Sequence, residues 1–229
     1  MSEPDRPHPL PLVVTLAALT VVSGLVDAVS FLGLGHVFTA NMTGNVVLLG
    51  FAAAGAPGFS MGASLCALAA FVVGAIAGGR LARRIQPLRN LLLVAMVIEV
   101  ACTVVAAVVA GVVPAVGSGW PRYTIIALLA VAVGQRNAAV RRVGVPDMST
   151  TVLTTALTGL ASNSSLAGGS NPHAHLARTT ILCMFGGALV GAVLVLHSGT
   201  TWALGIAAGI VAVTAVYYNR EVPIELTSA

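Results

Sequence analysis

PLVVTLAALTVVSGLVDAVSFLGL, residues 11–34, is an apolar run that contains a single charged side chain, Asp27. A helix rises 1.5 Å per residue and the hydrocarbon layer of a bilayer is roughly 30 Å thick, so about 20 apolar residues suffice to cross it. The run is too long for the core of a signal peptide, and it ends without a convincing small-residue cleavage site. It therefore predicts a retained membrane-spanning helix.

The rest of the chain has the composition of a membrane protein as well. Of its 229 residues, 57% are hydrophobic and 8% are charged, and the mean hydropathy is +0.97. A water-soluble core of this size cannot bury so much apolar surface. Further apolar runs occupy residues 59–80, 90–113, 122–140, 176–197 and 200–218. We therefore expect an all-α polytopic membrane protein with six transmembrane helices in contact with the lipid bilayer.

The basic residues predict how these spans are oriented. All eleven are arginines, and they gather where apolar runs end, so the net charge of +4 indicates membrane topology and no nucleic-acid partner. A cytoplasmic N-terminus leaves Arg122 alone outside and puts the other ten on or toward the inside, namely Arg6, Arg80, Arg83, Arg84, Arg89, Arg136, Arg141, Arg142, Arg178 and Arg220. The pattern predicts that both termini, residues 1–9 and 220–229, are cytoplasmic tails.

Two shorter segments, 43–56 and 148–163, each follow a long span and are too short to cross the bilayer comfortably. The stretch FTANMTGN (38–45) resembles LTTALTGL (153–160), with the Thr-Gly pairs aligned. Similarly, GLVDA (24–28) resembles GQRNA (134–138), and GAIAG (74–78) matches GALVG (187–191). The three pairs of segments are separated by nearly the same length of chain, as one duplication with small insertions requires.

These matches predict an internal repeat in which each half has a long span, a short segment and two more long spans. Three crossings per half place the second copy upside down in the membrane. We therefore expect an inverted 3+3 repeat, residues 10–115 and 119–219, within one transmembrane domain at 10–219, plus two short helical or re-entrant segments. Inverted repeats with discontinuous helices are typical of transporters.

The Thr-Gly segments carry the first set of candidate site residues. Backbone that is not helical at membrane depth must be buried in protein or line a wet cavity. In the first copy Thr39, Asn41, Thr43 and Asn45 can satisfy such backbone or coordinate a small ligand, and Gly44 permits close approach. The second copy offers Thr150, Thr151, Thr154, Thr155, Thr158 and Gly159. Helix capping and helix–helix hydrogen bonding are the structural alternative to a solute path.

Two acids lie inside predicted spans, where a charged carboxylate needs a partner. Asp27 is expected to pair with Arg136 or to hydrogen-bond Asn137, its counterpart in the repeat. This contact either fixes one span against another or lets Asp27 couple proton movement to a solute. Glu99 has no counterpart in the repeat, and it is either a second proton-relay candidate or a polar contact between helices.

The remaining motifs favour structure over chemistry. Gly74-x-x-x-Gly78 and Gly187-x-x-x-Gly191 predict that their spans pack closely around the pseudo-twofold axis, as internal contacts in preference to an oligomer contact. His173-x-His175 is a weak metal signal without nearby acids or cysteines. The three cysteines are isolated, and no catalytic triad, phosphate loop or zinc motif is present. We expect no enzyme activity, metal or cofactor.

Two long stretches resemble a known family. GLVDAVSFLGLGHVFTANMTGNVVLLG (24–50) and GQRNAAVRRVGVPDMSTTVLTTALTGLA (134–161) are similar to the YoaK-like bacterial integral membrane proteins, a domain of unknown function. The resemblance covers nearly the whole chain. It implies a multi-pass protein of the bacterial inner membrane, and it supplies no substrate, catalytic residue or cofactor.

These patterns lead to two hypotheses. The first is a small permease or channel-like transporter for a small polar solute, with or without a proton. Its path would be lined by Asp27, Asn41, Thr43, Gly44, Asn45, Arg136, Asn137, Thr154, Thr158 and Gly159. The second is a membrane scaffold or accessory subunit that transports nothing and in which every polar group is structural. Both leave a homo-oligomer open.

Overall fold

The computed structural model describes residues 9–113, 118–143, 153–164, 167–169 and 174–222. These residues form the helices α1 (Leu10–Gly33), α2 (Met42–Ala53), α3 (Met61–Arg84), α4 (Leu88–Val112), α5 (Gly119–Val143), α6 (Leu153–Ser162), α7 (Ala174–Ser198) and α8 (Thr200–Glu221). Within this part of the chain, six helices are long and apolar enough to cross a membrane. The predicted all-α fold with six spans and two short segments is confirmed.

Local sequence explains where several of these helices begin. Pro11 lies in the first turn of α1, where the missing N–H of proline costs nothing. Asn41 caps α2, because its side-chain oxygen accepts the Gly44 N–H at 3.3 Å. Ser60 caps α3 by accepting the Ala63 N–H at 3.3 Å. Both caps satisfy backbone donors that the first helical turn leaves unpaired.

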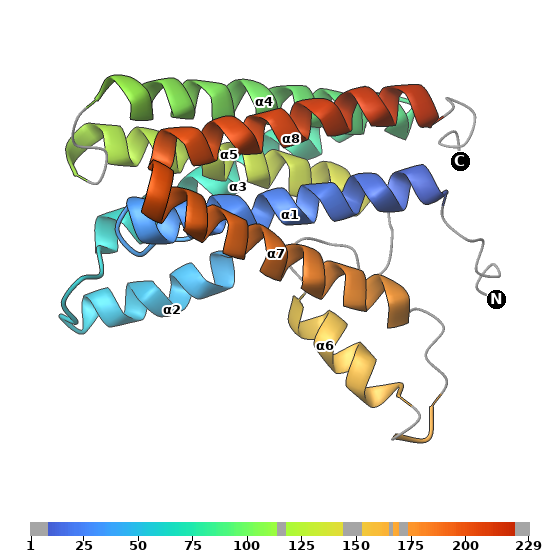
Figure 1. Cartoon of the computed structure of the whole chain (residues 1–229), viewed down its shortest axis with the longest axis horizontal. Helices are drawn as coiled ribbons and strands as arrows, with labels where there is room; N and C mark the ends of the chain where they lie inside the picture. Colours follow the sequence, from blue (N-terminus) through green and yellow to red (C-terminus); the bar gives the residue numbers. More distant parts are fainter. Residues whose placement is uncertain (1–8, 114–117, 144–152, 165–166, 170–173, 223–229) are drawn as a thin grey trace.

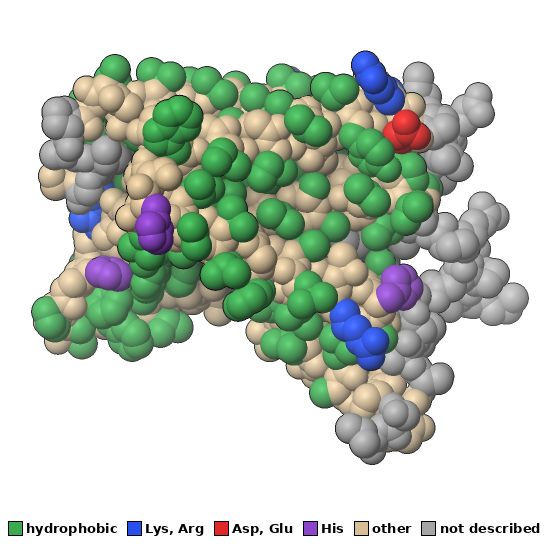
Figure 2. Space-filling model, viewed as in Figure 1, with side chains coloured by type: hydrophobic (Ala, Val, Ile, Leu, Met, Phe, Trp, Pro, Cys, Tyr) green, Lys and Arg blue, Asp and Glu red, His purple; other side chains and the backbone are tan. Residues whose placement is uncertain are grey.

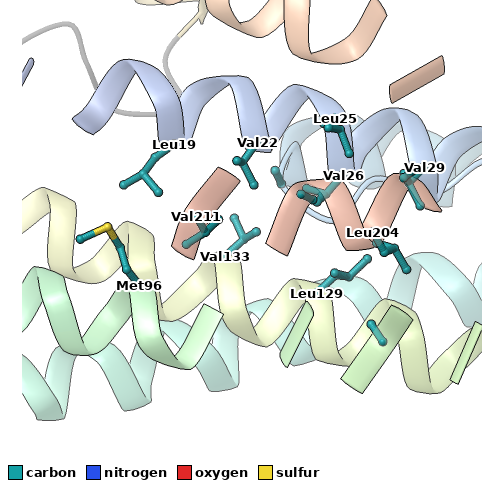
Figure 3. Close-up of a cluster of buried hydrophobic side chains, with 14 of the residues drawn as sticks. Leu19, Val22, Leu25, Val26, Val29, Met96, Leu129, Val133, Leu204 and Val211 are labelled. Atoms are coloured by element: carbon teal, nitrogen blue, oxygen red, sulfur yellow. The ribbon is translucent and has the colours of Figure 1, made fainter. Parts of the chain in front are cut away.

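The long helices form a bundle, and α2 and α6 lie against one side of it (Figure 1). The spans α1 and α5 are the most buried. In Figure 3 their side chains, among them Val26 and Val133, meet Met96 of α4 and Val211 of α8. Inside a bilayer such contacts stabilise by close packing, since lipid tails are as apolar as the side chains themselves. These side chains form the apolar core of the molecule, which also encloses several polar side chains, Arg136 and Glu99 among them.

The glycine motifs bring two pairs of helices into backbone contact. A methyl group at Gly74 of α3 would collide with the Val131 carbonyl oxygen of α5, and one at Gly187 of α7 would collide with the Val21 carbonyl oxygen of α1. Internal packing is therefore confirmed. However, the two motif helices do not pack on each other in the part of the chain described here, because α3 contacts α5 and α7 contacts α1.

The contacts of one half match those of the other, residue by residue. Gly24 abuts the backbone of Met184 and Ala188, while Gly134, its counterpart in the repeat, abuts the backbone of Phe71 and Ala75. These two pairs of neighbours have the same spacing along the chain as the GAIAG and GALVG motifs. The helix pairs follow the same rule: α4 packs on α5 as α8 packs on α1, and α2 packs on α3 as α6 packs on α7. This correspondence is consistent with the predicted inverted repeat.

Polar and apolar surfaces separate along the bundle. Hydrophobic side chains cover the middle of the face in Figure 2, and charged side chains on this face lie near the ends of the long helices. Helix α1 begins and α8 ends at the same end of the bundle (Figure 1). Because successive long helices alternate in direction, that end also carries Arg83, Arg84, Arg141 and Arg142. The protein is built to lie across a membrane.

Candidate solute path

The polar stretch between α1 and α2, residues 34–41, is called the tip below, and the side chain of Asp27 holds it in place. Asp27 is 4% exposed, and its Oδ1 accepts the backbone N–H groups of Thr39 at 2.9 Å and Ala40 at 2.7 Å. Lipid cannot satisfy such N–H groups, so a carboxylate at this position replaces the missing water. The tip is thereby fixed against a spanning helix, less than two turns before that helix ends.

Two asparagines complete the tip. The Asn45 side chain forms a two-sided pair with the backbone of Phe38, accepting its N–H at 2.9 Å and donating to its carbonyl oxygen at 2.6 Å. Asn41 caps α2, as described above. A methyl group at Gly44 would lie 2.7 Å from the Phe38 ring, so the ring would have to move to admit a larger residue. The predicted structural role of these residues is therefore real, and Asn45, which is fully buried, is committed to it.

A cavity of about 350 Å³ lies where α2 and α6 begin, and its walls come from α1, α2, α6 and α7. It contains hydroxyl and amide groups at membrane depth, since Thr20 and Met184 lie near the middle of α1 and α7. The lining residues are Thr20, Asn41, Thr43, Gly44, Val47, Leu153, Thr154, Thr180 and Met184. Four predicted path residues, Asn41, Thr43, Gly44 and Thr154, thus meet in one place.

A second cavity, of about 320 Å³, adjoins the first, because Asn41 and Met184 line both. Asp27 is in its wall, together with Gly24, Ala28, Phe31, Leu32, Phe38, Asn41, Met184, Ala188 and Ala192. The rings of Phe31 and Phe38 are stacked there with centroids 4.9 Å apart. The Asp27 Oδ2 atom has no hydrogen-bond partner among the described residues. Asp27 is therefore both a support for the tip and part of a cavity wall.

The predicted ion pair between Asp27 and Arg136 is wrong. Arg136 is fully buried in the bundle, and its Nη1 lies 2.6 Å from Glu99 Oε1 of α4. Its Nη2 donates to Ser23 Oγ of α1 at 2.6 Å, so the guanidinium links three helices. The physical reason is that Asp27 already binds the tip, whereas Glu99 has only Arg136 to neutralise it in the core. Glu99 is thus a polar contact between helices.

Sequence reasoning missed the polar neighbours of this ion pair. Gln135 donates to the Ala95 carbonyl oxygen at 2.7 Å and joins α5 to α4 next to the pair. Its Oε1, like Glu99 Oε2 and Arg136 Nε, has no hydrogen-bond partner among the described residues. A continuous polar triplet, Gln135 to Asn137, inside a span was the available signal.

The other predicted path residues do not line the two cavities. Arg136 belongs to the buried ion pair, Asn137 is buried at 8% exposure, and Thr158 is on the exposed side of α6 with Gly159 next to it. Thr154 is instead the residue that faces Thr43 across the first cavity from α6. Thr158, which the Thr-Gly alignment paired with Thr43, is not among the residues that line this cavity. Thr150 and Thr151 lie outside the described residues.

The fold and these cavities define a class of protein: a helical, multi-span integral membrane protein with a polar interior. A family model described as "Protein of unknown function (DUF1275)" matches residues 15–217, and the chain belongs to this family. The predicted YoaK-like resemblance is thereby confirmed.

One named relative supports the YoaK-like resemblance as well. The chain is similar to the UPF0700 transmembrane protein YoaK of Bacillus subtilis (strain 168), with 34% identity over 149 residues. The match covers 63% of this chain and 64% of that protein, slightly less than two thirds of its length. No solved structure matches the chain.

Proposed function

We propose that the protein is a small permease or channel-like transporter of the bacterial inner membrane for a small polar solute. The observation that carries the proposal is the first cavity, where the starts of both short helices meet at membrane depth. A polar cavity in this position has a structural cost, because hydroxyl and amide groups must be kept away from lipid. A bound solute that forms hydrogen bonds with those groups would offset this cost.

The chemistry of the cavity suits a polar, hydrogen-bonding solute. The first turn of a helix has N–H groups without helical partners and carries a partial positive charge. Here α2 presents Thr43 and Gly44, and α6 presents Thr154, to the same space. Paired half-helices whose starts meet between two repeats form the binding sites of many transporters. The correspondence between the two halves of this chain supports the same interpretation.

The orientation belongs to the proposal as well. The bundle end that carries the last turns of α3 and α5, with four exposed arginines, is the cytoplasmic end under the positive-inside rule. Both termini are then cytoplasmic, because α1 begins and α8 ends there.

The rival function is a scaffold that transports nothing. One observation favours it: the side chains of Asp27, Asn41 and Asn45 all bind backbone groups of the tip or of the first turn of α2. A polar tip could therefore exist for folding alone. The scaffold leaves the hydroxyl groups of Thr43 and Thr154, which line the cavity from two different helices, without a role.

Thiol labelling separates the two functions. In a background where Cys66, Cys102 and Cys183 are replaced by alanine, Thr43→Cys and Val46→Cys are compared on the same helix. Thr43 lines the cavity, whereas Val46 is 60% exposed and is not among the cavity residues. A membrane-impermeant methanethiosulfonate reagent should label the cysteine at position 43, and also Thr154→Cys. Val46→Cys should stay unlabelled, because an exposed apolar position on this helix faces lipid, which the water-soluble reagent does not enter.

The labelled protein is then tested for flux in liposomes, with a panel of small polar solutes and osmotic swelling as the readout. Blocking the cavity at position 43 should abolish the swelling that the unlabelled variant supports. Protection of both cavity positions, to the same degree as Val46→Cys, would leave the scaffold as the function.

A further inference from the structure

The second cavity has one charged residue in its wall, Asp27, and that residue carries an unsatisfied oxygen. Oδ1 accepts the Thr39 and Ala40 N–H groups and the Asn41 N–H also stabilises the carboxylate, while Oδ2 is itself buried and accepts no hydrogen bond from a side chain of the described residues. An unpaired carboxylate oxygen in a low-dielectric site is costly unless a donor or a cation reaches it. No lysine, arginine or histidine is among the residues that line this cavity.

The charges nearby leave the cavity net negative. The buried cation of α5, Arg136, is already neutralised by Glu99, whose Oε1 lies 2.6 Å from its Nη1. The start of α2 contributes a partial charge of about +0.5, against the full negative charge of the carboxylate. The Asp27 end of the path therefore favours a positive group in a bound molecule, and it disfavours a carboxylate or phosphate.

The remaining walls select among cations. Alkali and alkaline-earth ions bind through several oxygen ligands. This cavity offers the Asp27 carboxylate and the Asn41 amide, and no cluster of three acids, histidines or cysteines occurs anywhere in the described residues. Its other walls are apolar or aromatic, including the stacked rings of Phe31 and Phe38. Aromatic faces attract organic cations, and apolar walls suit the carbon atoms attached to them.

We propose that the Asp27 cavity binds a small organic ammonium group, with the carboxylate as its counter-charge and the rings of Phe31 and Phe38 against its carbon atoms. The site names the charge class of the transported solute, and in that respect it rests on the proposed function. A volume of about 320 Å³ is at the small end of ligand pockets, so the ammonium belongs to a compact molecule.

Binding to the purified full chain in detergent tests this site without any flux measurement. The probe is n-propylammonium, and 1-propanol and propionate serve as its uncharged and anionic counterparts at matched ionic strength. Asp27→Asn keeps an oxygen for the Thr39 and Ala40 N–H groups and removes the charge. We expect calorimetric binding of n-propylammonium to weaken about tenfold or more in this variant, and the two counterparts to bind weakly or not at all.

A second variant covers the case in which Asp27→Asn does not fold. Ala192→Leu fills the cavity and leaves the carboxylate intact, and Ala101→Leu adds the same side chain at an exposed site on α4. Binding should be lost in the first and unchanged in the second. Equal binding in Ala192→Leu, unchanged binding in Asp27→Asn, stronger binding of propionate, or competition by sodium ions at equal concentration would each overturn the ammonium site.

These outcomes are distinct from failure of the proposed function. Binding of n-propylammonium without any flux in liposomes would support the site and reject the transporter. Flux of an uncharged solute that labelling at position 43 blocks, without ammonium binding, would keep the transporter and reject the site.

Discussion

The α1–α7 contact beside Asp27 and the α5–α3 contact beside Gly134 share one steric arrangement and differ in the charged residues that follow on the central helix. In both, a glycine on the central helix, Gly24 or Gly134, meets the backbone of the outer helix. Within the next turn of the central helix, the polar residues differ. The first contact has Asp27 beside a cavity, whereas Arg136, two residues after Gly134, contacts α4 and α1 and forms a buried ion pair with Glu99.

The comparison shows that packing and polar function are separable in this fold. The glycines set how closely the helices approach, and that requirement is met twice. The charged residues answer different needs: Arg136 and Glu99 neutralise each other between helices, and Asp27 satisfies the backbone of a tip while one oxygen stays unpaired. Glu99 Oε2 and Arg136 Nε are unpaired as well, so what distinguishes Asp27 as a candidate site is its place in a cavity wall.

Breaking the ion pair should have the largest effect on stability. Arg136→Met leaves Glu99 without a counter-charge in the core, and removing one partner of a buried pair costs about 3–5 kcal/mol. The free energy of unfolding is measured by SDS titration in mixed micelles. Arg141→Met, on the same helix and exposed, is the matched control and should change it by less than about 0.5 kcal/mol.

A double variant sharpens the first test. Glu99→Leu combined with Arg136→Met replaces both charges by apolar groups, which is often neutral or stabilising for a buried pair. Stability should return most of the way to that of the wild type. If Arg136→Met alone proves no worse than the exposed control, the ion pair is not the link between α4 and α5 that the geometry indicates.

Removing the acid that holds the tip should have an effect of comparable size. Asp27→Ala leaves the Thr39 and Ala40 N–H groups buried without an acceptor, at about 1–3 kcal/mol for each group. Asp27→Asn retains an oxygen at the same position, so its cost in unfolding free energy should stay under about 1 kcal/mol. The difference between the two variants in the same SDS titration measures the support of the tip alone. Equal costs would mean that the charge, and not the acceptor, holds the tip.

Much of the fold could be predicted because membrane spans are set by length and apolarity. The predicted run 59–80 became α3, which ends at Arg84. The helix extends beyond the apolar run because an arginine can bury the aliphatic part of its side chain and keep its charged group at the membrane interface. The Gly motifs also predicted internal contacts correctly. Which helix meets which was beyond the motifs, since a small-residue surface accepts any partner of matching shape.

The partners of the buried charges were harder to predict. Repeat alignment placed Asp27 and Asn137 at equivalent positions, and this suggested a contact across the pseudo-twofold axis. A better signal was distance from the loop between α4 and α5. Glu99 and Arg136 lie a comparable number of residues before and after that loop, so antiparallel packing brings them to similar depth. The bonds of Asp27 to the Thr39 and Ala40 N–H groups could not be predicted, because they depend on how the chain turns back after the end of α1.

The smallest expected effect concerns the shared steric arrangement itself. Gly74→Ala and Gly187→Ala each force a methyl group against a carbonyl oxygen of the facing helix, at a cost of about 1–3 kcal/mol. Because the two contacts are equivalent, the two costs should be of similar size.

The matched controls for this last test are Gly79→Ala on α3 and Gly186→Ala on α7. A methyl group at either position meets nothing within 4 Å, so only the helix preference of alanine over glycine remains, up to about 1 kcal/mol in favour of the variant. Both controls should therefore be as stable as the wild type or more so. Unequal costs at Gly74 and Gly187 would show that one of the two contacts carries more of the fold. The two contacts would then have the same geometry but contribute differently to the free energy of unfolding.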